Sequence, residues 1–319
     1  MAGPRTSRPD AGPPASRSAS LVPDQAPAGM RIWLMAARPR TLPAAIAPVL
    51  VGTSLAIEQG VFHPVSFVAA LLGSIFIQVG TNLANDYSDA RRGADTDDRL
   101  GPVRVTAGGL APPRQVLLAT YITFGMAVVC GLYLVAVAGP ELLLVGVASI
   151  LAGVTYTGGP KPYGYEGLGE LFVFLFFGVV AVVGSYYVQI QQLPWQAFVL
   201  SVPVGLLAAA ILVVNNIRDL ETDRRAGKRT LAVRLGRERT RVLYASIVGG
   251  AFVAALVPWI AGSLTAWLAL SWLALPLAVP VIRTVRERTD GPSLNGALAA
   301  TGKLQLAFCL LLSAGILAS

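Results

Sequence analysis

The chain has few charged side chains. Asp, Glu, Lys and Arg make up 13% of its 319 residues, whereas soluble domains carry about 25%. Apolar residues account for 54% of the sequence, and so much apolar surface must face something other than water. The scarcity of charge therefore excludes an ordinary soluble protein and indicates one that lies in a lipid bilayer.

Cysteine and histidine are nearly absent. Cys130 and Cys309 both lie in apolar segments, so no disulfide framework is expected. His63 is the single histidine, and no metal site can be built around it alone. The net charge of +8 is explained by membrane topology, because basic residues stay on the cytoplasmic side, and we expect no nucleic acid partner.

Long apolar segments recur from residue 41 to the C-terminus, several of them near the roughly 20 residues that a helix needs to cross a bilayer. Residues 31–40 predict a short amphipathic helix at the membrane interface. Residues 1–29 are rich in Pro, Ala, Ser and Arg and predict a disordered tail before a single domain at 30–319. The sequence thus predicts an all-α, multi-pass bundle of nine transmembrane helices, at 41–58, 65–86, 114–138, 141–157, 168–189, 196–218, 240–261, 264–283 and 296–317.

The basic residues predict the orientation of this bundle. With nine spans the loops alternate between two sides, and no Lys or Arg lies in the loops 59–64, 139–140, 190–195 and 262–263. The other side is therefore cytoplasmic and holds the N-terminus, while the C-terminus lies outside. We expect a protein of the cell membrane whose partner is the lipid bilayer, with no sign of an obligate protein partner.

Acidic motifs end the second and the sixth predicted spans. Residues three or four apart share one face of a helix, so each motif predicts a polar stripe. Because the pattern occurs twice, we expect two repeated four-helix halves, followed by a ninth helix, with their acidic sites facing each other. The first stripe is Asn82, Asp86 and Asp89, with Asn85 beside it, and the second is Asn215 or Asn216, Asp219 and Asp223.

The composition of these motifs favours a hard metal ion. Carboxylates without His or Cys suit Mg²⁺ or Ca²⁺, and Mg²⁺ is typically held by one or two carboxylates together with substrate phosphates. The loops that follow both motifs are rich in Arg and Lys. Acidic and basic groups together at the rim of a membrane bundle indicate a phosphate ligand bridged by metal.

At this point the motifs resemble a known family. Asn-Asp-x-x-Asp at 85–89 and Asp-x-x-x-Asp at 219–223 are similar to those of the UbiA superfamily of intramembrane prenyltransferases, and the resemblance extends over nearly the whole chain from residue 31. The segments 38–43, 101–110 and 156–170 resemble the branch that prenylates 1,4-dihydroxy-2-naphthoate in menaquinone synthesis. The chain departs from many members at Gly93, where they carry a third Asp; either Asp95 replaces it or the first site uses fewer carboxylates.

The resemblance implies an activity and a set of roles. A polyprenyl group would pass from polyprenyl diphosphate to the aromatic acid 1,4-dihydroxy-2-naphthoate with loss of CO₂, giving demethylmenaquinone. The implied cofactor is Mg²⁺, held by Asp86, Asp89, Asp219 and Asp223, which are also catalytic together with Tyr156 and Lys161. The implied substrate-binding residues are Asn82, Asn85, Asn215, Asn216, Arg38, Arg40, Arg104, Lys228 and Arg229.

Aromatic side chains follow the fourth predicted span. Tyr156, Tyr163, Tyr165 and the Phe residues of 172–177 are candidates to shield an allylic cation. Two alternatives stay open: a transporter, which would place its polar residues near the membrane midplane, and a prenyltransferase for another acceptor such as hydroxybenzoate, homogentisate or a porphyrinoid. The prenyl chain length and the oligomeric state do not follow from the sequence.

Overall fold

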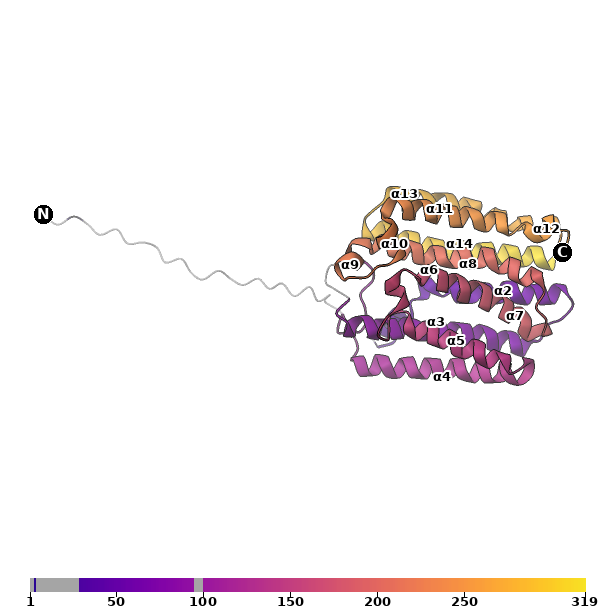
Figure 1. The fold of residues 1–319 in the computed structure, drawn as a ribbon, viewed down its shortest axis with the longest axis horizontal. Coiled ribbons are helices and arrows are strands. Elements are labelled where there is room, and N and C mark those ends of the chain that lie inside the picture. The colour runs from indigo at the N-terminus through magenta and orange to yellow at the C-terminus, as the bar shows by residue number, and fades with distance from the viewer. Residues whose placement is uncertain (1–2, 4–28, 95–99) are drawn as a thin grey trace.

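The computed structural model of the chain describes residues 3, 29–94 and 100–319. Every regular element within these ranges is a helix, and no strand occurs there. The long helices run along a common direction and form one bundle (Figure 1). The predicted all-α architecture is therefore confirmed for the described ranges, whereas the predicted tail at 1–29 lies almost wholly outside them.

The α-helices are joined by short connections and interrupted by 3₁₀ segments (η1, η2 and η4) and a π-helical segment (η3). In chain order the elements are α1 (Gly29–Ala37), η1 (Pro39–Thr41), α2 (Pro43–Glu58), α3 (Pro64–Arg91), α4 (Pro113–Ala138), α5 (Glu141–Thr155), η2 (Tyr163–Glu166), α6 (Gly169–Phe174), η3 (Leu175–Val180), α7 (Ala181–Ile190), α8 (Trp195–Arg218), α9 (Leu220–Arg225), α10 (Leu231–Leu235), α11 (Arg237–Ala254), α12 (Val257–Ile260), η4 (Ala266–Ala274), α13 (Leu275–Glu287) and α14 (Gly291–Leu317).

Seven helical segments of the described chain are long and apolar enough to cross a membrane, and an eighth results if a pair bent by 53° counts as one span. The chain is therefore a multi-pass membrane protein. The helix α5 is apolar but has 15 residues, so at about 1.5 Å per residue it falls short of a hydrocarbon core about 30 Å thick. The count of nine spans and the division into two four-helix halves thus stay predictions. The seven segments are Pro64–Arg91, Pro113–Ala138, Gly169–Ile190, Trp195–Arg218, Arg237–Ile260, Ala266–Glu287 and Gly291–Leu317.

The predicted amphipathic segment at 31–40 is a separate helix, α1, followed by the short η1. It buries Ala36 and exposes Met30 and Leu34. Its inner face packs with Leu83 of α3 and Val105 of the following loop in a small apolar cluster. The helix α1 is thereby attached to the same end of α3 that carries the first acidic motif.

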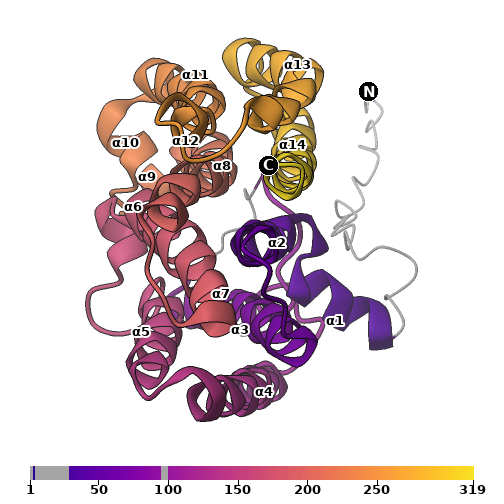
Figure 2. The same cartoon turned by 90° about the vertical axis from the view of Figure 1, so that its right-hand side faces the viewer.

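The main apolar core surrounds α8, and 72% of the apolar stretch of this helix is buried. The view along the helices shows α2, α7 and α8 between two outer groups, α3–α4–α5 and α11–α13–α14 (Figure 2). Only 17% of the apolar stretch of α4 is buried, so this helix lies at the periphery. Side chains of α8 are therefore enclosed by protein, whereas much of the surface of α4 faces outward from the bundle.

Small residues let the helices of the core approach each other, as is common in membrane bundles. A Cβ atom on Gly52 of α2 would collide with the backbone carbonyl of Val182 in α7. A Cβ atom on Gly178 of η3 would lie 2.6 Å from the Cα atom of Gly205 in α8. These contacts hold the span that contains η3 and α7 against α2 and α8.

We expect Gly52→Leu to destabilise the bundle, because the contact with the α7 backbone leaves no space for a side chain. Overpacking of this kind costs about 1–3 kcal/mol. The measurement is the Tm of the purified protein in detergent. Gly249→Leu on α11 is the control, since this glycine is exposed and a Cβ atom on it would meet no other atom within 4 Å; an unchanged Tm in Gly52→Leu would contradict the packing of α2 against α7.

Candidate functional site

The polar end of α3 presents two faces. Asn85 and Asp89 lie one helical turn apart and line a cavity inside the bundle. The carboxylate of Asp86 is directed away from this cavity, toward the loop between α3 and α4. The predicted stripe of Asn82, Asp86 and Asp89 is therefore divided between different partners.

The loop between α3 and α4 is bound through Asp86. The backbone N–H groups of Val105 and Thr106 donate to its two carboxylate oxygens at 3.0 Å and 2.8 Å. Asp86 is 2% exposed and does not line the cavity. These bonds position the preceding residue of the loop, Arg104, whose Nη2 lies 3.1 Å from Oδ2 of Asp89.

Asp89 is the centre of the first acidic motif. Its Oδ1 accepts a hydrogen bond from the Tyr165 hydroxyl at 2.6 Å, and its Oδ2 accepts from Arg104. One turn earlier, Oδ1 of Asn85 accepts from the hydroxyl of Thr157 at 2.9 Å. The segment that follows α5 thus supplies partners to both cavity-lining residues of α3.

The second motif lies at the end of α8 and is organised by Arg218. The guanidinium group donates to both oxygens of Asp219, at 2.8 Å and 2.5 Å, and is 2% exposed. It also donates to the amide oxygens of Asn215 at 2.8 Å and of Asn295 in α14 at 2.7 Å. Because Arg218 neutralises Asp219 and connects α8 with α14, the carboxylate is held in one place at the cavity wall.

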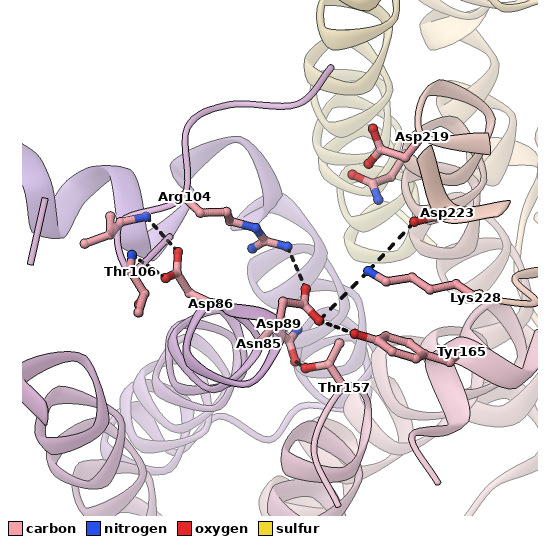
Figure 3. Close-up of polar contacts among 12 residues, drawn as sticks. Asn85, Asp86, Asp89, Arg104, Thr106, Thr157, Tyr165, Asp219, Asp223 and Lys228 are labelled. Atoms are coloured by element: carbon pink, nitrogen blue, oxygen red, sulfur yellow. Dashed lines mark hydrogen bonds and ion pairs between the residues drawn. The ribbon is translucent and has the colours of Figure 1, made fainter. Parts of the chain in front are cut away.

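Lys228 joins the two motifs. Its Nζ atom lies 3.9 Å from Oδ1 of Asp89 and 3.8 Å from Oδ1 of Asp223, as Figure 3 shows. The same ammonium group lies 4.6 Å from the centroid of the Tyr165 ring, a cation–π contact. The structure therefore brings together the two acidic motifs, as the repeat in the sequence predicted.

The N-terminal side of the site is held by Asn82. Its amide donates to the carbonyl oxygen of Ala37 at 2.9 Å, and the hydroxyl of Thr41 donates to the carbonyl of Arg38 at 3.0 Å. Arg38 has a φ of 53° and a ψ of 69°, a left-handed conformation that is uncommon outside glycine. Strained residues cluster at functional sites, and Arg38 lines the cavity.

The cavity has a volume of about 460 Å³. One end is polar and the rest is apolar, with walls from α3, α4, α5 and the span that contains η3 and α7. The aromatic rings of Tyr163 and Phe172 stack at 4.0 Å between centroids on its wall, and burial raises the pKa of Tyr163 above the ordinary value of a phenol. The polar end is lined by Arg38, Asn82, Asn85, Asp89, Arg104, Tyr156, Asn215, Asn216, Asp219, Asp223 and Lys228.

Besides Asp86, three residues predicted from the sequence lie away from the cavity wall. Lys161, Arg40 and Arg229 are exposed and do not line the cavity. Arg229 contributes through its backbone, whose N–H donates to the carbonyl of Tyr165 at 2.7 Å. The possible substitute ligand Asp95 lies outside the described ranges.

The backbone conformation at position 93 favours glycine over the Asp that many family members carry there. Gly93 ends α3 with a φ of 63°, and the next N–H, that of Ala94, donates back to the carbonyl of Asp89 at 3.0 Å. An L-residue is strained in this conformation, whereas glycine adopts it freely. A glycine here lets the chain turn directly after the acidic motif.

Sequence reasoning missed several partners of the acidic residues. Thr157, Arg218 and Asn295 carry ordinary side chains for a loop or a helix end, and only their placement gives them a role. Glu170 is also buried, and its Oε1 accepts from the amide of Asn216 at 2.8 Å. Two signals were available in the sequence. Thr157 and Glu170 lie in the segment 156–170 that carries the family resemblance, and Arg218 is adjacent to Asp219, which positive-inside topology explained equally well.

The chemistry of the polar end suits phosphate and a hard cation. No three His, Cys, Asp or Glu side chains converge to form a complete metal cage in the part of the chain that the structure describes. The carboxylates of Asp89, Asp219 and Asp223 and the amide oxygens nearby are the donor type that Mg²⁺ prefers, and Mg²⁺ commonly completes its shell with substrate phosphates. The donor set therefore fits a cation that binds together with an anionic ligand.

Comparison with known proteins agrees with this geometry. Residues 45–298 match the model of the UbiA prenyltransferase family. A 1,4-dihydroxy-2-naphthoate octaprenyltransferase of Mycobacterium tuberculosis is 44% identical over 281 residues, covering 87% of this chain and 94% of that protein. The enzyme of the same name from Escherichia coli is 41% identical over 295 residues, covering 90% of this chain and 95% of that protein.

The fold has a counterpart among solved structures. A UbiA homologue from Archaeoglobus fulgidus, bound to DMAPP and Mg²⁺, superposes with a TM-score of 0.64 at 16% identity, covering 90% of this chain and 99% of that one. At this identity the likeness concerns the fold alone. The resemblance expected from the acidic motifs is confirmed, and the chain belongs to the UbiA prenyltransferase family.

Proposed function

We propose that this protein transfers a polyprenyl group from polyprenyl diphosphate to 1,4-dihydroxy-2-naphthoate with loss of CO₂, yielding demethylmenaquinol, the quinol form of demethylmenaquinone. The main support for the proposal is the position of Lys228, which lies between Asp89 and Asp223 at the polar end of an otherwise apolar cavity. Such a site can hold a diphosphate at one end and a hydrocarbon chain in the remainder. The names of the relatives from Mycobacterium tuberculosis and Escherichia coli support the choice of acceptor.

The polar end binds the diphosphate through cations. Lys228 and Arg104 are nine-tenths buried and already face carboxylates, and Arg38 lines the same wall. Asp89, Asp219 and Asp223 are the residues that would hold Mg²⁺ with the substrate. Mg²⁺ would neutralise the charge that develops on the diphosphate as it leaves.

The reaction then proceeds at the boundary between the polar and apolar parts. The bond between C1 of the prenyl chain and the diphosphate oxygen breaks, and the diphosphate takes both electrons. The ring carbon that bears the carboxylate attacks the allylic cation; CO₂ then leaves, and its bonding electrons restore the aromatic ring. Beside this boundary the ring of Tyr163 stacks on Phe172 and meets Tyr156 edge to face, and this aromatic cluster stabilises the cation and excludes water.

We further propose that Asp86 acts through the loop rather than as a ligand of Mg²⁺, the role that the sequence predicted. Both of its oxygens accept backbone N–H groups of the loop that carries Arg104. Loss of this anchor would release Arg104 from Asp89 at the cavity wall. Asp86 is then a positioning residue, and Asn85 and Asp89 are the residues of this motif that face the ligand.

The proposed topology places the reaction at the cytoplasmic face of the cell membrane. All nine predicted segments would span, the 15-residue α5 among them, and the loops at the end opposite the site contain no Lys or Arg. The C-terminus of α14 lies at that opposite end of the molecule (Figure 1). A site at one rim argues against the alternative of a transporter, whose polar residues would lie near the midplane.

The test of the proposed function is turnover by the purified protein in detergent with Mg²⁺, a prenyl diphosphate and a panel of acceptors. We expect 1,4-dihydroxy-2-naphthoate to gain the prenyl mass and lose the mass of CO₂, as measured by mass spectrometry. Prenylation of hydroxybenzoate or homogentisate in its place would identify another acceptor. Transport of a donor or acceptor into vesicles without turnover would overturn the proposal.

Asp89→Asn and Asp219→Asn should each lower kcat by roughly 100-fold or more, because each removes a buried charge from the diphosphate end of the site. Turnover is measured at saturating Mg²⁺, and gel filtration verifies that the variants are folded. Glu221→Gln is the matched control: this exposed residue of α9 pairs with Arg224 at the surface and should leave kcat unchanged. Full activity of either aspartate variant would contradict the assignment.

Asp86→Asn should lower turnover without changing the Mg²⁺ concentration for half-maximal activity. In this variant the NH₂ group of the amide would replace one of the two carboxylate oxygens and cannot accept a hydrogen bond from a backbone N–H. Because the loop then loses one hydrogen bond to α3, we expect faster hydrogen exchange at Val105 and Thr106. Asp89→Glu provides the contrast, because displacing a ligand oxygen should raise the Mg²⁺ requirement. A raised requirement in Asp86→Asn, with unchanged exchange in the loop, would make Asp86 a metal ligand after all.

A further inference from the structure

The apolar part of the cavity continues from the polar end toward the opposite side of the bundle. Its lining includes Leu142 at the beginning of α5 and Val188 near the end of α7. Tyr156, which lies at the polar end, directly follows the last residue of α5. The cavity therefore extends along nearly the whole of α5, about 20 Å at 1.5 Å per residue.

Three glycines on different helices leave this apolar part open. Gly131 of α4, Gly146 of α5 and Gly184 of α7 line the cavity, and a Cβ atom at each would meet no other atom within 4 Å. Gly153 and Gly164, near the polar end, also line the cavity but are in close contact with Thr81 and Tyr156. The distal glycines thus border empty space, whereas the proximal ones allow tight packing.

The three open glycines lie at a similar depth. Each is five to seven residues from the far end of its helix, which corresponds to about 8–11 Å. Gly146 is ten residues from Tyr156, so it lies about 15 Å from the polar end. A short prenyl chain whose diphosphate is bound at the polar end does not reach the three glycines, whereas a long chain has to extend past them.

Shape is the property by which this cavity distinguishes prenyl chains. A polyprenyl tail comes from the bilayer, and lipid is as apolar as the cavity wall, so transfer into the cavity releases little free energy per carbon. Whether a tail of a given length can bind then depends on the space that the glycines leave. A side chain at any of the three positions would occupy volume that a long chain requires.

We infer that Gly131, Gly146 and Gly184 determine the length of prenyl chain that this protein accepts. The inference rests on the proposed function and specifies its donor: a long polyprenyl diphosphate whose tail passes the level of the three glycines. The diphosphate end of the same donor is bound by other residues. The chain length and the chemistry are therefore set by separate parts of the cavity.

The experiment compares geranyl diphosphate with octaprenyl diphosphate as donors for the purified protein. In Gly146→Leu and Gly184→Leu we expect turnover of geranyl diphosphate to stay at the wild-type level and kcat/KM for octaprenyl diphosphate to fall roughly tenfold or more. The corresponding Ala variants should transfer both donors normally, because one methyl group fits. Leucine also favours the helix over glycine, so folding should not suffer.

Gly125→Leu and Gly131→Leu form a matched pair on α4. Both positions have open space around a Cβ atom, but Gly125 is exposed and does not line the cavity, so only Gly131→Leu should discriminate against the long donor. Two results would overturn the inference while leaving the proposed function intact. One is octaprenyl diphosphate turnover at the wild-type level in every Leu variant, and the other is an equal fall in turnover of geranyl and octaprenyl diphosphate. A wild-type protein that transfers neither donor would contradict the proposed function itself.

Discussion

The site depends on the ion pairs that Lys228 makes with Asp89 and Asp223. Carboxylates inside a membrane bundle are costly, and three of them at one cavity wall would repel one another without cations between them. Lys228, Arg104 and Arg218 provide these cations and are nearly buried themselves. Positive and negative side chains thus lie side by side at the cavity wall. An anionic ligand would meet the cations there, and a divalent cation would meet the carboxylates, so the two can bind together.

The surrounding structure holds this balance from several directions. The α3–α4 loop is bound to α3 through Asp86, and the carbonyl of Leu100 in the same loop accepts from the amide of Asn295 in α14. Asn295 in turn accepts from Arg218. The loop is therefore bonded directly to the first acidic motif and is linked to the second through Asn295 and Arg218, so the two helices of the site are connected although they are far apart in the sequence.

The sequence predicted the components of the site better than their roles. The apolar segments, the acidic motifs and their meeting at one end follow from hydropathy and from a pattern that occurs twice. The direction of each side chain does not follow: Asn85 and Asp86 are neighbours, yet one lines the cavity and the other binds a loop. Pairings such as Arg218 with Asn295 arise from tertiary packing, and the spacing of residues along one helix carries no information on them. For the same reason Lys161, in a Gly-rich turn, and Arg229, in a basic loop, were predicted at a site whose wall they do not reach.

The π-helical segment η3 has a consequence for the apolar part of the cavity. Such segments arise when a helix accommodates one extra residue in a turn. Phe176, before the end of η3, and Gly184, after it, both line the cavity. Because the wide turn absorbs the extra residue, the part of the span beyond it keeps the orientation that places Gly184 at the cavity wall and Val182 against Gly52. A residue can therefore be gained or lost in this turn by a change between π-helical and α-helical geometry, which gives evolution a way to alter the lining of the cavity on an unchanged scaffold.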